Sequence, residues 1–356
     1  MTKVFLIRHA EAEGNIYRRA HGHYNGLITN NGNLQIEELS KRFAKESIVA
    51  VYSSDLSRTC TTAKSISEPK NLQIQTTNML REVNMGTWED LSWGDIQYNY
   101  PEMYNNFTYD PDKWNIEGGE NYGDIKDRMY NFICEKASEH DGKAIAMFSH
   151  GFVIRALISK LENVPSERTR EVPYCDNTAV ALLNYENGDL SIEFHGDSSH
   201  LSSEISTLSR QSWWKKDHEH NSQNLRFKRL SEITDEELAQ ISHDDQSDSI
   251  DTLDEQYVAF HSDTPVGILG LDKKRDMDKS VGWLEYLHVI PSCQRMSYGT
   301  QLLGLAISEL RKLRRAKMRI EAPTHNTAVE FLSKYGFYTL ETNNGVCLME
   351  KDIKNW

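Results

Sequence analysis

Residues 3–9 read KVFLIRH, and this stretch decides the fold of the first part of the chain. Its apolar run predicts a buried strand, and Arg8 and His9 stand where that strand ends. In open α/β sheets, ligands bind outside the carboxyl ends of the strands. Arginine offers a bidentate fork to phosphate, and histidine serves as a nucleophile, an acid or a base. Taken alone, the two residues are equally compatible with a chance pair on the surface.

Strand-like and helix-like segments alternate through the first part of the chain. Short apolar or β-branched runs predict strands, and apolar residues at helical spacing predict helices. The expected strands are 48–52, 144–148, 179–183 and 190–194, and the expected helices are 33–46, 57–66 and 152–161. Repeated alternation of this kind favours an α/β domain with a mainly parallel sheet.

The length of 356 residues exceeds what one core usually organises, so we expect two domains. The periodic pattern breaks near residue 196, and polar residues there surround Trp213 and Trp214, which we expect to pack on one of the domains. The predicted division is a first domain at 1–203, a connector at 204–224 and a second domain at 225–356. In the second domain we expect an edge strand at 225–230, a hairpin of 257–260 and 266–271, a strand at 283–290 and a helix at 299–314.

The composition argues against several classes of protein. A formal net charge of -13 makes general binding to nucleic acid or to an anionic membrane unfavourable. The cysteines are scattered without a C-x-x-C pair, so we expect neither a disulfide framework nor a zinc knuckle, and a reducing compartment fits. No apolar run reaches the roughly 20 residues that span a bilayer, and the N-terminus has no signal-peptide pattern. We therefore predict a cytoplasmic protein without nucleic-acid or membrane partners, while the oligomeric state stays open.

Further polar motifs follow Arg8-His9, each in a loop or near an expected strand end. They are Asn15, Arg58, Glu82 within the run LREVNMGTW (80–88), and the triplet Ser149-His150-Gly151. Three of these residues have plain structural alternatives: Arg58 as a helix-surface charge, Glu82 as a solvated carboxylate and His150 as a satisfied core histidine. Taken together and in this order, they make residues 1–203 resemble the histidine phosphatase (phosphoglycerate-mutase-like) superfamily. The resemblance implies a three-layer α/β/α domain.

The resemblance also implies a role for each residue. His9 would accept the phosphoryl group, and Glu82 would be the general acid that protonates the leaving oxygen. The implied phosphate pocket consists of Arg8, Arg58 and His150, with Asn15 and the backbone N–H of Gly151 as further contacts. Phosphoryl transfer depends mostly on positioning and charge stabilisation, which two arginines and a second histidine supply without a metal. A carboxyl group near the leaving oxygen stays protonated if desolvation outweighs its cationic neighbours.

Two positions depart from the pattern of this superfamily. Ala10 stands where a glycine usually follows the Arg-His pair, and Ala12 replaces a threonine. We expect Ala10 to be tolerated, because alanine costs little unless the backbone requires a positive φ. The predicted reaction is hydrolysis of small phosphomonoesters. A phosphoglycerate-mutase-type transfer is the weaker alternative, because no extra substrate-retaining module is evident between Glu82 and His150. The loop with His21-Gly22-His23 borders the pocket in this superfamily.

A second constellation lies in the last third of the chain. An expected strand that carries Glu285 leads into the run QRMSYGT (294–300) and a helix start, and backbone N–H groups at a helix N-terminus bind phosphates. The run FLSKYGF (331–337) follows downstream. Residues 225–356 thereby resemble the GCN5-related N-acetyltransferase (GNAT) superfamily, which implies a mixed α/β domain that binds acetyl-CoA and acetylates an amine acceptor. The implied coenzyme contacts are Val289, Gln294, Arg295, Ser297, Gly299, Thr300 and Asn326.

This second signature departs further from its superfamily. Ser297 replaces the first glycine of the pyrophosphate loop, and Leu332 stands where a tyrosine acid is usual, with Tyr335 three residues later. Glu285 is the candidate general base, and an alternating polar strand residue is the equal alternative. A regular strand would place His288 on the face opposite Glu285.

Two weaker signals accompany these sites. The basic run 311–315 either forms a solvated helix face or attracts the phosphates of the coenzyme. The run Asp217-His218-Glu219-His220 could bind a metal ion, but it lacks the further ligands that a metal site needs. We expect no metal. The main hypothesis for the whole chain is a phosphatase fused to an acetyltransferase. The alternative keeps the phosphatase and makes the second domain a non-catalytic, regulatory binder of acyl-CoA.

Overall fold

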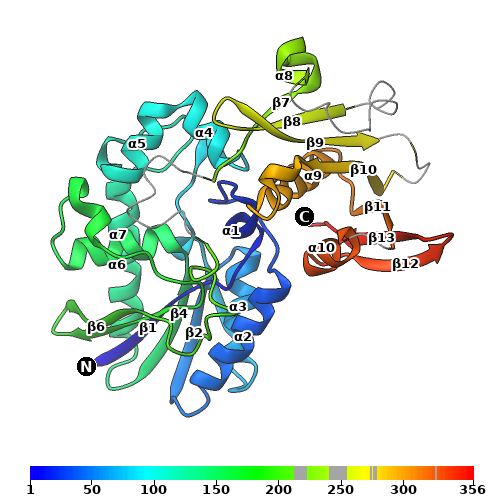
Figure 1. Cartoon of the computed structure of the whole chain (residues 1–356). Coiled ribbons are helices and arrows are strands. Elements are labelled where there is room, and N and C mark those ends of the chain that lie inside the picture. Colours follow the sequence, from blue (N-terminus) through cyan, green and yellow to red (C-terminus); the bar gives the residue numbers. More distant parts are fainter. Residues whose placement is uncertain (212–222, 240–254, 273–274, 276–278, 325–326) are drawn as a thin grey trace. The chain divides into compact units, whose positions relative to one another are not determined.

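The computed structural model describes residues 1–211, 223–239, 255–272, 275, 279–324 and 327–356. The chain forms two compact units (Figure 1). Unit 1 contains Met1–Asn15, Ala20–Glu89 and the described part of Tyr100–His220, and unit 2 contains Ile16–Arg19, Asp90–Asn99 and the described part of Asn221–Trp356. Trp213, Trp214 and the run from Asp217 to His220 lie outside the described residues.

Unit 1 is built on a six-stranded sheet with the strand order β3-β2-β4-β1-β5-β6. The strands are β1 (Thr2–Arg8), β2 (Ile48–Ser54), β3 (Ile74–Thr77), β4 (Ala144–Ser149), β5 (Val180–Glu186) and β6 (Asp189–Asp197). The first four strands pair in parallel, while β5 and β6 are antiparallel to their neighbours. The prediction of a mainly parallel sheet is confirmed, with two antiparallel strands added on one side.

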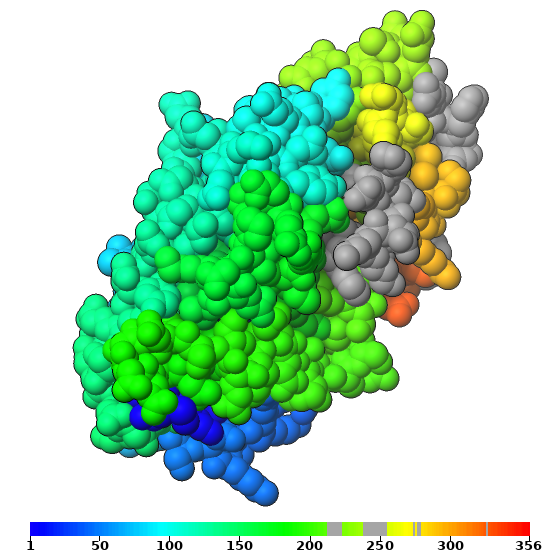
Figure 2. Space-filling model, turned by 90° about the vertical axis from the view of Figure 1, so that its left-hand side faces the viewer, coloured from blue at the N-terminus to red at the C-terminus, as the bar shows by residue number. Residues whose placement is uncertain are grey.

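Helices cover both faces of this sheet (Figure 1). On one face, α2 (Asn30–Arg42) and α3 (Ser57–Ser67) contribute Leu39 and Ile66 to a core that also contains Phe148 of β4. On the other face, α6 (Tyr122–Ser138) and α7 (Gly151–Leu161) contact β1. The predicted three-layer α/β/α arrangement is confirmed. Because β1 lies inside the sheet, only a small part of the first residues (dark blue) reaches the surface in Figure 2.

Shorter helical segments complete the first half of the chain. They are α1 (Glu13–Tyr17), α4 (Trp93–Asn99), α5 (Pro101–Tyr109), and the 3-10 helices η1 (Asn78–Leu80), η2 (Gly86–Trp88), η3 (Pro111–Lys113) and η4 (Ser166–Glu171). Of these, α4 and the end of α1 belong to unit 2. No helix among the described residues combines the length and the apolar character needed to cross a bilayer.

Unit 2 is built on a seven-stranded sheet with the strand order β12-β13-β11-β10-β9-β8-β7. The strands are β7 (Arg226–Arg229), β8 (Glu255–His261), β9 (Thr264–Asp272), β10 (Val281–Val289), β11 (Lys317–Pro323), β12 (Tyr338–Asn343) and β13 (Val346–Asp352). Among the described residues of 223–356, the helices are α8 (Asp235–Ala239), α9 (Tyr298–Lys312), α10 (Ala328–Lys334), and the 3-10 helices η6 (Leu230–Glu232) and η8 (Pro291–Cys293). The predicted edge strand is β7 and the predicted hairpin is β8–β9, so both are confirmed.

The parallel register of unit 1 determines where the polar strand ends meet. Arg8 at the end of β1 lies opposite Ser149 at the end of β4. The His9 N–H then donates to the Ser149 carbonyl over 3.0 Å. The residues that follow these two central strands are therefore held side by side, at the sheet edge where the sequence predicts a ligand site.

Candidate active site

His9 lies at the centre of the polar strand ends of unit 1. Its ring is only 5% exposed, and the ring centroid is 5.2 Å from that of His150, which follows β4. His9 Nδ1 lies 2.7 Å from the Ala10 carbonyl oxygen. Because a carbonyl only accepts hydrogen bonds, Nδ1 carries the proton and Nε2 keeps its lone pair. Burial, together with the charges of Arg58 and Arg8, lowers the pKa of His9 well below its ordinary value, so the ring is neutral.

Arg58 is a buried cation held by backbone carbonyls. From the first turn of α3, its guanidinium donates to the carbonyls of His21, Gly22 and Tyr24 over distances of 2.7–3.2 Å. Burial lowers the pKa of Arg58 to about 10. Its side chain is 2% exposed, so the alternative of a helix-surface charge is wrong.

His150 presents a proton rather than a lone pair. Arg58 Nε donates to His150 Nδ1 over 3.2 Å, so the proton of the neutral ring is on Nε2. The pKa of His150 is lowered well below its ordinary value, first by burial and then by Arg58. His150 Nε2 is buried and has no hydrogen-bond partner within the described parts of the chain. The alternative of a satisfied core histidine is therefore wrong, and a donor is available for a ligand.

Arg8 is positioned by the loop that precedes β5. Its Nη1 donates to the Cys175 carbonyl over 2.6 Å, while its buried Nε finds no partner among the residues described. A Cβ added to Gly151 would lie 3.0 Å from Arg8 Nε. The missing side chain at Gly151 thus leaves room for the guanidinium beside the first turn of α7.

Glu82 lies against the N-terminus of α7. Its carboxyl oxygens accept the backbone N–H groups of Phe152 and Val153 at 3.1 Å and 3.2 Å, and also that of Val83 at 2.9 Å. Free N–H groups at a helix start favour an acidic side chain. The side chain is half-buried, so Glu82 is not the solvated carboxylate of the structural alternative. His23 Nε2 lies 3.1 Å from the Glu82 carbonyl oxygen, which ties the loop with His21-Gly22-His23 to this residue.

Asn15 and Ala10 stabilise the loop that carries His9. Asn15 Oδ1 accepts from the Ala12 N–H at 2.9 Å and from Asn177 Nδ2 at 3.3 Å. Its direct contact with substrate phosphate stays a prediction. Ala10 is fully buried and does not have a positive φ, so alanine replaces the usual glycine without backbone strain, as expected.

Two side chains at this site were not identified from the sequence. Asn177 Nδ2 donates to the His9 carbonyl over 2.9 Å, although the two residues are far apart in the chain. Arg128 Nη2 donates to the Glu82 carbonyl over 3.2 Å, and the same guanidinium forms two hydrogen bonds with Glu120. The sequence signal that could have indicated Arg128 is its partner Glu120, an acidic residue directly after Gly118-Gly119. No local pattern marks Asn177.

The predicted coenzyme loop of unit 2 has the expected position before a helix. Gln294 Nε2 donates to the Val289 carbonyl over 3.2 Å, and Gly299 and Thr300 lie in the first turn of α9. Arg295 and Ser297 both have left-handed backbones, with φ of 62° and 64°. Ser297 thus adopts the conformation that the usual glycine takes without strain. Asn326 lies outside the described residues.

The two strands before and after α9 separate near this loop. β10 pairs in parallel with β11 only from Val281 to Trp283, although both strands continue. A register shift between Leu284 and Tyr286 interrupts the pairing of β10 with β9. Leu284, Leu287 and Val289 all pack into the core around α9, so the two-residue alternation is broken. The premise that a regular strand separates Glu285 from His288 is wrong, because the bulge adds one residue.

The acetyltransferase candidates have contrasting surroundings. Both carboxylate oxygens of Glu285 accept from Arg275 Nη1, at 3.0 Å and 3.1 Å. Tyr335 instead lies beside the coenzyme loop, because Thr300 Oγ1 donates to its phenol oxygen over 2.8 Å. The basic run 311–315 begins at the C-terminal end of α9, about 15–20 Å from the helix start by helix rise. It therefore does not contribute to a phosphate site at the start of α9.

Comparison with known proteins agrees with this geometry. Residues 4–198, more than half of the chain, match the histidine phosphatase superfamily (branch 1). The chain belongs to this superfamily. Phosphoserine phosphatase 1 of Hydrogenobacter thermophilus is 28% identical over 186 residues, which cover 52% of this chain and 88% of the relative. Phosphoglycerate mutase-like protein 4 of Arabidopsis thaliana is 31% identical over 203 residues, with 56% and 86% covered.

A solved structure and a second family match complete the comparison. YhfR of Bacillus stearothermophilus superposes with a TM-score of 0.55 and 26% identity, over 56% of this chain and 99% of that chain. Residues 214–337 match the acetyltransferase (GNAT) family. The chain therefore combines a histidine phosphatase domain with a GNAT domain, and both predicted fold classes are confirmed. Among the residues that the structure describes, no group of three or more His, Cys, Asp or Glu side chains could hold a metal ion.

The neutral histidines of the phosphatase domain predict a loss of stability in acid. In the unfolded chain a histidine takes up a proton near pH 6.5, whereas the lowered pKa values of His9 and His150 keep both rings neutral in the folded domain. The unfolded state then binds more protons below pH 6.5, so the free energy of unfolding falls by about 1.4 kcal/mol per histidine between pH 7.5 and 5.5. Urea unfolding of the wild type and of His150→Gln at both pH values measures this difference. The variant should lose about 1.4 kcal/mol less, and equal losses would contradict the assignment.

The left-handed backbone of Ser297 predicts that glycine is better tolerated there than elsewhere in the GNAT domain. Ser297→Gly should raise the free energy of unfolding of this domain by up to about 1 kcal/mol, because glycine adopts φ of 64° without the Cβ clash. The control is Ser333→Gly in α10, an exposed helical position where glycine should cost about 0.5 kcal/mol. Thermal and urea unfolding measure both changes. A loss of stability in Ser297→Gly as large as in the control would refute this interpretation.

Proposed function

We propose that the first domain hydrolyses small phosphomonoesters without a metal, through a phosphohistidine at His9. The observation that supports this proposal most directly is the tautomer of His9. The ring is neutral, buried and protonated on Nδ1, so the lone pair of Nε2 is free for attack on phosphorus. Arg8, Arg58 and the Nε2 proton of His150 supply positive charge and hydrogen bonds for the equatorial phosphoryl oxygens.

In the first step, His9 Nε2 forms a bond to phosphorus while the bond from phosphorus to the ester oxygen breaks. As the general acid, Glu82 gives a proton to the leaving alcohol oxygen, which makes the alcohol neutral. Glu82 lies at the start of α7, next to Gly151 and therefore near the Arg8 guanidinium. The proton on His9 Nδ1 remains hydrogen-bonded to the Ala10 carbonyl oxygen, which stabilises the charge that develops on the ring.

In the second step, water attacks the phosphorus of phosphohistidine and the bond to His9 Nε2 breaks. The carboxylate of Glu82 takes a proton from that water, so it returns to its acid form. Phosphate leaves and His9 is neutral again. Division of the hydrolysis into two transfers replaces one difficult displacement with two easier ones.

The substrate class we propose is a small phosphorylated hydroxy or amino acid. The relatives named above support this choice, since one is a phosphoserine phosphatase and the other is a phosphoglycerate mutase-like protein. Hydrolysis is preferred to mutase transfer because no extra substrate-retaining module is evident in the sequence between Glu82 and His150. A mutase would return the phosphoryl group to the substrate and release no phosphate, so the two reactions are distinguished by their products.

Replacement of His9 tests the proposal. We expect His9→Ala to lower phosphate release from phosphoserine, 3-phosphoglycerate and an aryl phosphate by about a thousandfold or more, because the nucleophile is lost. The control is His140→Ala, a histidine in the loop before β4 whose Nε2 contacts the Tyr52 hydroxyl. Acid-labile, base-stable phosphate on His9 of the wild type should appear in rapid-quench samples. Unchanged activity in His9→Ala would overturn the proposal.

For the GNAT domain we propose binding of acetyl-CoA at residues 289–300 and transfer of the acetyl group to an amine. Tyr335 is the candidate acid for the departing thiolate, since its phenol oxygen accepts from Thr300 next to this loop. One observation favours the second candidate function, a non-catalytic acyl-CoA-binding domain. Glu285, the candidate base, already faces Arg275, which also contacts Glu321. A carboxylate neutralised by a guanidinium is a poor acceptor for the proton of an ammonium group.

Two measurements separate these functions. Acetyl-CoA should raise the unfolding temperature of the full chain under both, because a ligand that binds only the folded state stabilises it. Acetyl transfer to a panel of amines should then be lowered at least tenfold in Glu285→Gln if Glu285 is the base, with Glu321→Gln as the control that removes the other partner of Arg275. Acetyl-CoA binding without transfer to any amine would support the non-catalytic function. No stabilisation by acetyl-CoA would refute both.

A further inference from the structure

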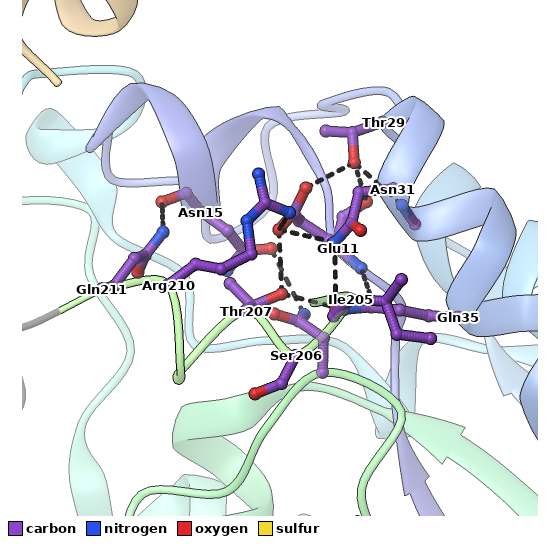
Figure 3. A network of polar contacts seen from close by, with 12 residues as sticks. Glu11, Asn15, Thr29, Asn31, Gln35, Ile205, Ser206, Thr207, Arg210 and Gln211 are labelled. Atoms are coloured by element: carbon purple, nitrogen blue, oxygen red, sulfur yellow. Dashed lines mark hydrogen bonds and ion pairs between the residues drawn. The ribbon is translucent and has the colours of Figure 1, made fainter. Parts of the chain in front are cut away.

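Residues 205–211 form a polar segment that we call the clasp. It follows β6 in the chain and lies against the loops that carry the phosphate site (Figure 3). Its contacts centre on two buried carboxylates, Glu11 and Asp176, which are 2% and 4% exposed. A buried carboxylate is costly unless donors surround it. The donors of these two groups therefore show what the clasp contributes.

Asp176 depends mainly on the clasp. Its Oδ1 accepts the backbone N–H groups of Thr207 and Leu208 at 3.1 Å and 3.2 Å, and its Oδ2 accepts the Ser206 hydroxyl. Its remaining hydrogen bond is from the N–H of Asn177. Of its four donors within the described residues, three therefore come from the clasp, and loss of the clasp would leave a buried charge without most of these partners.

Glu11 receives its donors from two parts of the chain, the start of α2 and the clasp (Figure 3). Thr29 Oγ1 and Asn31 Nδ2 donate from the start of α2, at 2.7 Å and 3.1 Å. Thr207 Oγ1 donates from the clasp at 2.9 Å and accepts Gln35 Nε2 at 3.0 Å. Thr207 therefore joins Glu11 to α2 and, through its own backbone N–H, to Asp176.

Each carboxylate stands next to a residue of the phosphate site. Glu11 follows His9 by two positions, in the loop that ends at Asn15. Asp176 lies between Cys175, whose carbonyl accepts Arg8, and Asn177, whose amide holds the His9 carbonyl. The clasp thus fixes the two loops that determine where the Arg8 guanidinium and the His9 ring stand.

We propose that the clasp is a positioning element of the phosphate site, and that Thr207 and Ser206 are its positioning residues. They act through Glu11 and Asp176 and do not touch the substrate. The proposal rests on the proposed phosphatase function. Its consequence is that weakening the clasp impairs phosphate binding and transfer more than the loss of folded stability explains. Along the chain, the clasp directly precedes the residues that match the GNAT family.

The test compares two changes of matched chemistry in the full chain. Ser206→Ala combined with Thr207→Val removes the clasp hydroxyls, and Thr2→Val removes a buried hydroxyl that contacts the Ala137 and His140 carbonyls at the opposite end of β1. Thr2 and Thr207 are 1% and 3% exposed, so both substitutions remove a buried hydroxyl that donates a hydrogen bond. The double variant should lower kcat/KM at least tenfold and raise the Kd for inorganic phosphate at least fivefold. Thr2→Val should change each less than twofold, at a temperature where all variants are folded by circular dichroism.

Each outcome decides the proposal. Recovery of kcat/KM in Thr207→Ser to within about threefold of the wild type, a difference of less than about 1 kcal/mol, would support it, because that variant keeps the hydroxyl. A double variant that behaves like Thr2→Val, in a wild type that forms phosphohistidine, would overturn the clasp and leave the phosphatase function standing. A wild type that neither binds inorganic phosphate nor releases it from any ester would overturn the phosphatase function and the clasp with it. If the wild type binds inorganic phosphate but hydrolyses no ester, the Kd values for phosphate test the proposal alone. A Kd that rises at least fivefold in the double variant but not in Thr2→Val would support the clasp, and equal Kd values would overturn it.

Discussion

The hydrogen bond from His9 Nδ1 to the Ala10 carbonyl is the interaction on which the phosphate site depends. It places the N–H proton of the neutral ring on Nδ1, away from Nε2, the atom that we propose accepts the phosphoryl group. The bond forms because β1 ends at Arg8, so His9 and Ala10 have left the sheet while their backbones are still held by Ser149, Asn177 and Thr62. Burial then makes the cationic form of the ring unfavourable, and both effects favour a nucleophile.

The cations around His9 are held mainly by carbonyl dipoles rather than by carboxylates. Arg58 donates to three backbone carbonyls, and Arg8 donates to one. A carbonyl satisfies an N–H group without neutralising the guanidinium charge, so that charge remains available to a phosphoryl group. Such groups are already oriented before the substrate binds, and little reorganisation is then needed during transfer. Among the described residues, Arg8 Nε and His150 Nε2 also lack a hydrogen-bond acceptor, so both N–H groups are available to a phosphoryl oxygen.

Local sequence could predict the parts of this site that stand at strand ends. The apolar residues of the run KVFLIRH predict a buried strand, and this prediction places Arg8 and His9 at the end of the strand. The apolar run before Ser149 predicts the position of His150 in the same way. Asn177 and Asp176 escaped prediction because their partners come from segments more than 25 residues away, and hydrogen bonds of that range leave no periodic signal. The bulge at Glu285 escaped it for another reason. One added residue changes which face a side chain occupies without changing the composition of the strand.

The two domains differ in whether the charged side chains of their candidate sites are paired with a group of opposite charge. In the phosphatase domain, the positive charges near His9 lack full counterions, and the energetic cost of that burial is offset by the surrounding backbone and loops. In the GNAT domain, the acidic candidate Glu285 is already paired with Arg275, whose guanidinium also lies 4.0 Å from the centre of the Trp283 ring. A carboxylate that is paired with a guanidinium accepts a proton less readily than an unpaired one. The proposed phosphate site thus holds cations that backbone carbonyls do not neutralise, whereas the contact with Arg275 argues against Glu285 as a proton acceptor.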